Sequence, residues 1–121
     1  MRAMLSASNC LETKNHEQVR VIFTEAQRQL KIPRHPELRD KKFITSRLKR
    51  TIENPDFIYQ DFEKPKRRMV VYKEEYRFDG RVRYTKVVLE RKKSYYFVIT
   101  AFRPDFVKER GKTKRIYGKD N

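Results

Sequence analysis

The spacing of apolar residues changes at Pro55, and this change constrains the fold more than any other feature of the sequence. Before Pro55, apolar residues recur at the spacing of one side of an α-helix. After Pro55, they alternate with polar residues as far as Phe102, as the two faces of β-strands require. The order of the two patterns predicts an α+β domain in which helices precede and cover an antiparallel sheet.

Two helices are expected before the change of spacing. Residues 15–31 carry one apolar stripe, and Asn15 can cap the start of this first helix. Pro36 can occupy the first turn of the second helix, with His35 just outside it. The second helix ends before Pro55, because the residue that precedes a proline avoids helical backbone angles.

The strands expected after Pro55 cover residues 57–62, 69–76, 82–90 and 95–102. The first of them is expected at an edge of the sheet. The segment 78–81, with Asp79-Gly80 at its centre, favours a tight hairpin between the second and the third. The basic tail, residues 105–121, is expected to begin as a short helix and then to fray.

The expected architecture is therefore two N-terminal helices packed on one antiparallel sheet of about four strands. Residues 1–14 match neither pattern, and they are expected to form a flexible leader. Residues 15–121 are then one domain, as the length of the chain favours.

The charge of the chain points to a polyanionic partner. Its 121 residues include 31 Lys and Arg against 16 Asp and Glu, which gives a net charge of +15. Such an excess opposes compaction by self-repulsion, and nucleic acid is the first candidate to relieve it. A membrane surface is less favoured, because the sequence has neither a long basic amphipathic helix nor a run of about 18 apolar residues.

Several classes of site are excluded by what the sequence lacks. One cysteine, Cys10, and two histidines cannot supply a four-ligand zinc site, and no disulfide can form within the chain. Three glycines leave no phosphate-cradling loop, no serine has the context of a nucleophile elbow, and the carboxylates show no two-metal pattern. We therefore expect no metal and no cofactor, and the single cysteine suits a cytoplasmic protein.

Alternation sorts the strand residues into two faces. The face expected to be buried holds Met69, Val71, Val87, Leu89, Phe97, Ile99 and Ala101. The opposite face holds Tyr72, Tyr84, Lys86, Val88, Tyr96, Val98 and Thr100. Because this second set mixes aromatic rings, a lysine and a hydroxyl, it indicates an open face with a function.

Such a face can cleave RNA without a metal if it offers a base, an acid and groups that stabilise negative charge at phosphorus. His35 is the candidate proton carrier, because the ordinary pKa of histidine, about 6.5, is close to working pH. Thr100 and Lys86 could bind the phosphate, and Tyr72 could stack on a base or assist proton transfer. The structural alternatives are a helix-capping histidine, a strand-forming threonine, a solvated lysine and a tyrosine that fills the sheet face.

Four more residues are candidates for binding RNA or phosphate, namely Tyr84, Arg103, Lys108 and Arg68. Tyr84 could stack on an unpaired base. Arg103 and Lys108 follow the last strand and could clamp the substrate, and Arg68 ends a basic loop. In a chain so rich in cations, each of these basic residues could equally belong to a solvated surface.

The chain contains in order His35-Pro36-Glu37-Leu38, Ile52-Glu53-Asn54-Pro55-Asp56-Phe57-Ile58-Tyr59, Arg68-Met69-Val70-Val71-Tyr72-Lys73 and Val98-Ile99-Thr100-Ala101-Phe102. In these segments it resembles the phage-type barnase–EndoU–colicin–RelE-like nucleases, over about residues 35–118. The resemblance implies helices before a four-stranded antiparallel sheet with a metal-independent ribonuclease site. It matches His35 to the helix-start histidine of the family and Thr100 to the hydroxyl of its last-strand motif. Lys86, Arg103 and Lys108 fall at basic positions that vary within the family.

These observations predict a metal-independent endoribonuclease, toxin-like, that leaves a 2′,3′-cyclic phosphate. The resemblance implies tRNA or mRNA as the substrate, and an acidic antitoxin or immunity protein could neutralise the basic face. The alternative is a non-catalytic module that binds RNA or DNA, or an accessory subunit of a larger nucleoprotein assembly.

Overall fold

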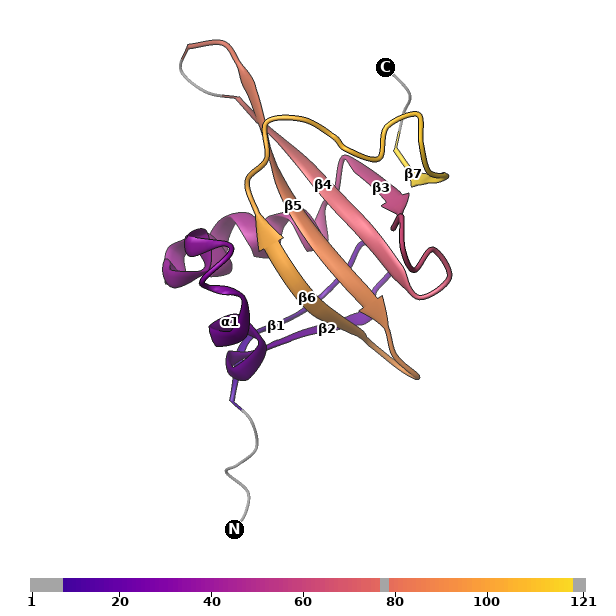
Figure 1. The fold of residues 1–121 in the computed structure, drawn as a ribbon. Helices are drawn as coiled ribbons and strands as arrows, with labels where there is room; N and C mark the ends of the chain where they lie inside the picture. Colours follow the sequence, from indigo (N-terminus) through magenta and orange to yellow (C-terminus); the bar gives the residue numbers. More distant parts are fainter. Residues whose placement is uncertain (1–7, 77–78, 119–121) are drawn as a thin grey trace.

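The computed structural model of the chain describes residues 8–76 and 79–118. Within these residues, one seven-stranded sheet has the order β1-β2-β6-β5-β4-β3-β7 (Figure 1). The strands are β1 (Asn9–Lys14), β2 (Arg20–Thr24), β3 (Phe57–Gln60), β4 (Arg68–Tyr76), β5 (Val82–Arg91), β6 (Tyr96–Phe102) and β7 (Arg115–Tyr117). The helical segments between β2 and β3 are α1 (Glu25–Lys31), the 3₁₀-helix η2 (Pro36–Arg39), the π-helix η3 (Phe43–Leu48) and α2 (Lys49–Glu53).

The protein mixes helices and strands, but the predicted architecture of two N-terminal helices on a sheet of about four strands is wrong. Residues 15–31, expected to be one helix, are helical only in α1. The chain before α1 forms the antiparallel β1–β2 hairpin, and β2 pairs in parallel with β6. Residues 9–14 of the expected leader are therefore a strand of the sheet, while residues 1–7 lie outside the described part of the chain.

The reason for this difference lies in residues 15–24. Asn15 accepts two backbone N–H hydrogen bonds through Oδ1, and Gln18 has a φ of 67°, so a tight turn forms where a helix cap was expected. After the turn, Val21 and Phe23 are fully buried at alternate positions. The apolar residues of this segment fit a helical and an alternating spacing equally well, and the turn together with strand-favouring side chains decides for the strand.

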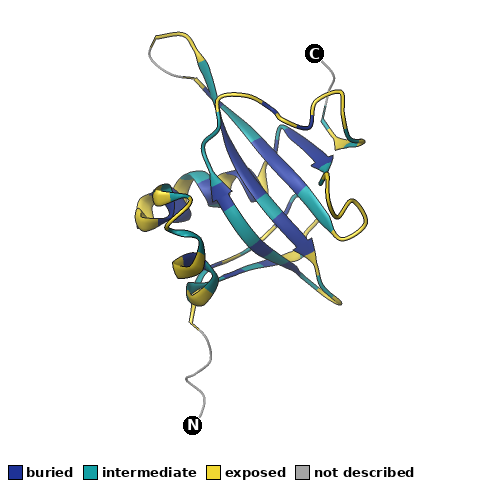
Figure 2. Ribbon diagram, in the orientation of Figure 1, coloured by how far each residue is buried: buried dark blue, intermediate teal, exposed yellow. Residues whose placement is uncertain are grey.

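Residues 36–53 are largely helical, as expected for the second helix, but they form three short pieces instead of one helix. Pro36 begins η2, and α2 ends at Glu53 with Asn54 as its C-cap, before Pro55 as expected. With α1, these pieces cover one face of the sheet, and the core between the layers contains Leu38, Ile44, Leu48, Ile52, Ile58, Val71, Val87, Leu89, Val98 and Ala101 (Figure 2). No helix in the described residues is long and apolar enough to cross a membrane.

Strands β3 to β6 lie close to the residues expected for them. β4 and β5 pair antiparallel, and the connection between them contains Gly80 with a φ of 84°. Phe78, with which the predicted hairpin segment begins, lies outside the described residues. β3 is not an edge strand, because β7 pairs along its other side. The tail that was expected to fray thus supplies a strand, although residues 119–121 are not described.

One irregularity in β6 changes which of its residues face the helices. Thr100 pairs with Val88 and Val98 pairs with Leu89, so Ile99 is the extra residue of a β-bulge. Nε2 of Gln27 in α1 donates a hydrogen bond of 2.7 Å to the carbonyl oxygen of Ile99. This bond gives a partner to a backbone group at the point where the strand ladder is interrupted.

The bulge reverses the predicted faces of the first half of β6. Tyr96 and Val98 belong to the core under the helices, whereas Phe97 pairs with Glu90 on the other face. After the bulge, Ala101 faces the helices and Thr100 faces away from them, as alternation predicted.

Gly118, which follows β7, should tolerate no side chain. Its φ is 101°, and an added Cβ would lie 2.2 Å from the carbonyl oxygen of Asp56. We expect Gly118→Ala to lower the free energy of unfolding by roughly 2–4 kcal/mol, because a left-handed alanine and a backbone clash are combined. Gly111→Ala is the control, since Gly111 has a φ of 74° with nothing near the added Cβ, and it should cost about 1–2 kcal/mol. Urea unfolding measures both, and equal losses would contradict this packing of Gly118.

Candidate nucleic-acid site

The face of the sheet that points away from the helices is only partly open. Residues 103–113 leave the end of β6 and pass across β5 and β4 toward β7 (Figure 1). Val107 of this segment belongs to a second apolar cluster, whose other members lie beneath the segment and are Phe57, Tyr59, Val70, Tyr72 and Tyr84. Farther along, Val88, Phe97 and Thr100 are half-buried. On β5 and β6, accessible residues of this face include Val88, Phe97, Thr100 and Phe102, and these four are here named the β5–β6 strip.

Glu109 joins the crossing segment to the sheet. Its Oε1 accepts a hydrogen bond from the hydroxyl of Tyr72, and its Oε2 lies 3.2 Å from Nζ of Lys86. Glu109 is 2% exposed, Lys86 is 7% exposed and Tyr72 is fully buried. A buried ion pair of this kind needs close geometry and additional hydrogen bonds to offset the loss of hydration, and the Tyr72 hydroxyl supplies one.

The same network fixes the protonation of Tyr72. Burial raises the pKa of its hydroxyl far above the ordinary value, and the hydrogen bond to Glu109 raises it further. Tyr72 is therefore a hydrogen-bond donor to Glu109 at neutral pH. The proton-transfer role predicted for Tyr72 would require this hydrogen bond to break first.

His35 lies near the start of the crossing segment, where β6 ends. It precedes η2, and its ring stacks on Phe102 with the centroids 4.2 Å apart and the planes 6° apart. Nζ of Lys86 lies 5.3 Å from the centroid of the same Phe102 ring. Since Phe102 pairs with Lys86 and follows Thr100 by two residues, all three side chains lie on the face away from the helices. We name His35, Lys86, Thr100 and Phe102 the Phe102 corner.

The surroundings of His35 favour its neutral form. Burial lowers the pKa of the imidazole, and the charges of Arg34, Lys31 and Lys86 lower it further, while Glu37 acts in the opposite direction. A neutral imidazole can accept a proton at neutral pH. Burial, together with the neighbouring cations, therefore suits His35 to the role of a base.

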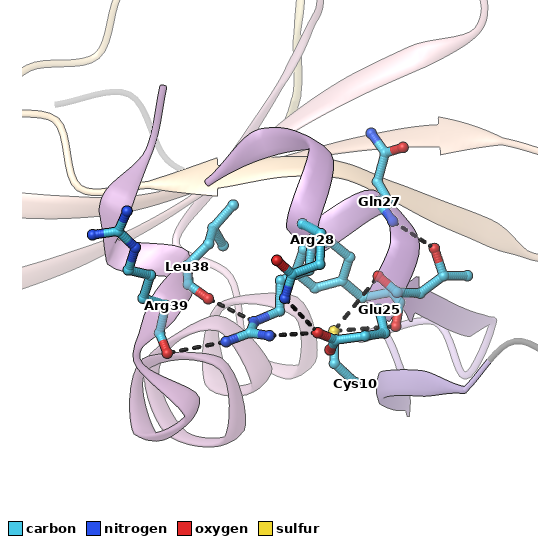
Figure 3. A network of polar contacts seen from close by, with 9 residues as sticks. Cys10, Glu25, Gln27, Arg28, Leu38 and Arg39 are labelled. Carbon is cyan, nitrogen blue, oxygen red and sulfur yellow. Dashed lines mark hydrogen bonds and ion pairs between the residues drawn. The ribbon is translucent and has the colours of Figure 1, made fainter. Parts of the chain in front are cut away.

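Arg28 of α1 holds the loop that presents His35. Its guanidinium, which is buried, donates to the carbonyl oxygens of Leu38 and Arg39 at 2.6 and 3.0 Å and pairs with Glu25 at 2.6 Å (Figure 3). These bonds attach η2 to α1 just after His35. Cys10 lies beside this network, and burial raises the pKa of its thiol to about 11, so the thiol is not an activated nucleophile.

Thr100 has a hydroxyl without a partner. Its Oγ1 is hidden from solvent and makes no hydrogen bond, although the residue as a whole is half-buried. A buried hydroxyl without a partner carries a cost that a hydrogen bond would remove. In its present position this hydroxyl is not accessible to a phosphate on the strip.

The residues predicted to bind RNA do not form one group. Tyr84 is buried beneath the crossing segment, where its ring meets Tyr72 edge-on with the centroids 5.9 Å apart. Arg68 lies on the face away from the helices, and its Nε is 2.8 Å from Oε1 of Glu90. Arg68 is therefore placed where it could meet a ligand on this face, whereas Tyr84 is covered.

Arg103 and Lys108 lie apart from the Phe102 corner. Nη2 of Arg103 is 3.4 Å from Glu75, which also pairs with Arg47 of η3, so the Arg103 side chain points to the helical side. Nζ of Lys108 lies 5.5 Å from the ring centroid of Phe62 on the outer surface. The structure thus places His35 and Lys86 against the same Phe102 ring, with Thr100 on the same face of β6, and it places these two cations elsewhere.

Two residues of the site were missed at the level of sequence. Phe102 has the same parity as Thr100, so alternation could have placed it on the same face. Glu109 gave no signal, because it is one carboxylate in a basic tail without periodic structure.

Among residues 8–76 and 79–118, no three His, Cys, Asp or Glu side chains gather as ligands for a metal ion. Comparison with protein-family models, with curated proteins and with solved structures gave no match to this chain.

Replacing Glu109 tests its role in holding the crossing segment. We expect Glu109→Leu to lower the free energy of unfolding by about 3–5 kcal/mol, because the buried charge of Lys86 loses its partner. Adding Lys86→Met should restore most of this loss, since removing both members of a buried pair is often close to neutral. Lys108→Met, at the exposed neighbouring position, is the control and should cost less than about 0.5 kcal/mol. If Glu109→Leu costs no more than this control in urea unfolding, the buried pair does not anchor the segment.

Proposed function

We propose that this chain is a metal-independent endoribonuclease that reacts at the Phe102 corner. The observation that carries the proposal is the stacking of the His35 ring on Phe102, on the face that also presents Thr100 and Lys86. The net charge of +15 supports a polyanionic substrate.

The chemistry follows from what each side chain can do. His35 takes the proton of a 2′-hydroxyl, and the resulting oxygen attacks the adjacent phosphorus. The bond to the 5′-oxygen then breaks, and the imidazolium can return its proton to that oxygen, which leaves a 2′,3′-cyclic phosphate. Lys86 and the hydroxyl of Thr100 stabilise the negative charge that builds up on the phosphate oxygens.

The biological role rests on the four segments that resemble the phage-type barnase–EndoU–colicin–RelE-like nucleases. We propose on this basis a toxin-like enzyme of the cytoplasm that cuts tRNA or mRNA. An acidic antitoxin or immunity protein would fit the charge of the chain.

A second candidate is a non-catalytic module that binds RNA. It is favoured by the engagement of Lys86 and Tyr72 with Glu109 and by the hidden hydroxyl of Thr100. A module of this kind would use the charge and aromatic rings of the open strip without proton transfer.

The two histidines of the chain offer a matched test of catalysis. We expect the purified protein to cleave total RNA in EDTA, with cyclic phosphate at the new 3′ ends, and His35→Ala to lower the rate by about 100-fold or more. His16→Ala is the control, because His16 lies against Tyr117 and not at the Phe102 corner. If His35→Ala cleaves as fast as His16→Ala, or if neither the native protein nor the variants cleave, the results would favour the non-catalytic binding module over the ribonuclease.

The pH dependence of cleavage gives an independent test of His35 as the base. Because burial lowers its pKa, the acidic limb of kcat/KM should have its midpoint below pH 6.5, with activity lost as pH falls and the imidazole becomes protonated. Initial rates at low substrate concentration, at constant ionic strength, measure this limb. A midpoint above 6.5 would assign the required proton to another group.

A further inference from the structure

A second group of cations lies on the same face at the other end of β5. Glu90 is buried there, with Arg68 and Lys92 each 2.8 Å from its carboxylate and Arg67 3.6 Å away. The hydrogen bonds from Lys92 and Arg68 lower the pKa of Glu90 to about 2, so its carboxylate is ionised at neutral pH. The four groups therefore carry three positive charges against one negative charge. We name them the Glu90 cluster.

The cations of the Glu90 cluster are arranged to meet an anion. The side chain of Arg67 is 64% exposed and that of Lys92 is 37% exposed, while Glu90 lies beneath them. The loop that presents Arg67 is held in place, because its N–H donates to Lys64 and its carbonyl oxygen accepts a 2.7 Å hydrogen bond from Arg91. Such an arrangement lowers the entropy lost when a phosphate is bound.

An aromatic ring adjoins the cluster. Phe97 pairs with Glu90 across the β5–β6 ladder, and Nζ of Lys92 lies 5.7 Å from the centroid of its ring. Phe97 is half-buried, so part of the ring is accessible. A partly exposed ring beside cations is the combination that binds unpaired nucleotides, because the base stacks and the phosphate is paired.

The Glu90 cluster and the Phe102 corner are joined by alternate pairs of the β5–β6 ladder, which share the face away from the helices. Glu90 pairs with Phe97, Val88 with Thr100, and Lys86 with Phe102. Glu90 and Lys86 are four residues apart on one strand, about 13 Å at the rise of a β-strand. This distance corresponds to a few nucleotides of an unpaired strand.

We propose that the β5–β6 strip binds single-stranded RNA along its length, with a phosphate at Arg67 and Lys92 and a base on Phe97. The scissile linkage then lies a few nucleotides away at the Phe102 corner. This inference rests on the function proposed for that corner, but its binding step does not depend on cleavage.

The test is binding of 2′-O-methyl oligonucleotides, which cannot be cleaved by 2′-hydroxyl attack, measured by fluorescence anisotropy. We expect the Arg67→Gln/Lys92→Gln variant to bind a single-stranded octanucleotide about tenfold more weakly than the native protein, because two phosphate contacts are lost. The factor by which the octanucleotide binds more tightly than a dinucleotide should shrink in this variant, because a dinucleotide cannot span the strip and does not gain from contacts at both of its ends. Phe97→Leu should weaken octanucleotide binding by about fivefold or more.

Lys41→Gln/Lys42→Gln is the matched control, since it removes the same charge from exposed positions on the helical side. An equal loss of octanucleotide affinity in both double variants would overturn the proposal, because it would reduce the effect to overall charge. Tighter binding of a duplex than of the single strand would also overturn it. If the length dependence holds while EDTA-resistant cleavage is absent, the strip stands and the catalytic proposal falls.

Discussion

The layout of the open face depends on the contacts that the buried Glu109 carboxylate makes with the sheet. This carboxylate accepts a hydrogen bond from the Tyr72 hydroxyl and forms an ion pair with Lys86, and all three groups are buried away from water. A charge buried in this way is costly unless every partner is in place, so the segment that carries Glu109 has one favourable position on the sheet. The position of that segment decides which strand residues are covered and which remain accessible.

The division of this face has a consequence for the charges. On the covered side, Lys86 is matched by a carboxylate and its charge acts at short range on Phe102 and His35. On the accessible side, the cations around Glu90 outnumber it and two of them are exposed. A ligand on the β5–β6 strip would therefore meet an exposed, positively charged end at Glu90 and a more enclosed end at Lys86. At the enclosed end, electrostatic interactions are less screened by water.

Much of the sheet could be predicted from the sequence, because β4 and β5 are long strands whose side chains point alternately to the two faces of the sheet, as they do at the end of β6. The β1–β2 hairpin could not, since residues 19–24 fit two spacings and the turn at Asn15 depends on hydrogen bonds that a helix cap would also use. The residues around Ile99 give no sequence signal of the bulge, because the carbonyl oxygen of Ile99 accepts its hydrogen bond from Gln27, which is far away in the sequence.

The candidate site shows the same division. Thr100 and Lys86 were placed on one face correctly, because both lie on the regular side of the bulge. The contact of His35 with Phe102 could not be predicted, since it depends on how Arg28 draws η2 toward α1. The burial of Tyr72 and Tyr84 could not be predicted from the sequence either, because it depends on the path of residues 103–113.

The parallel pairing of β2 with β6 bears on how the chain reaches its native state during synthesis. Val21 and Ile22 meet Tyr96 and Phe97, so β3, β4 and β5 must all leave the ribosome before this pair can form. At ordinary rates of translation the edge of β2 stays unpaired for several seconds. During this interval the nascent β1–β2 hairpin presents an unpaired strand edge at which wrong strand pairing can occur.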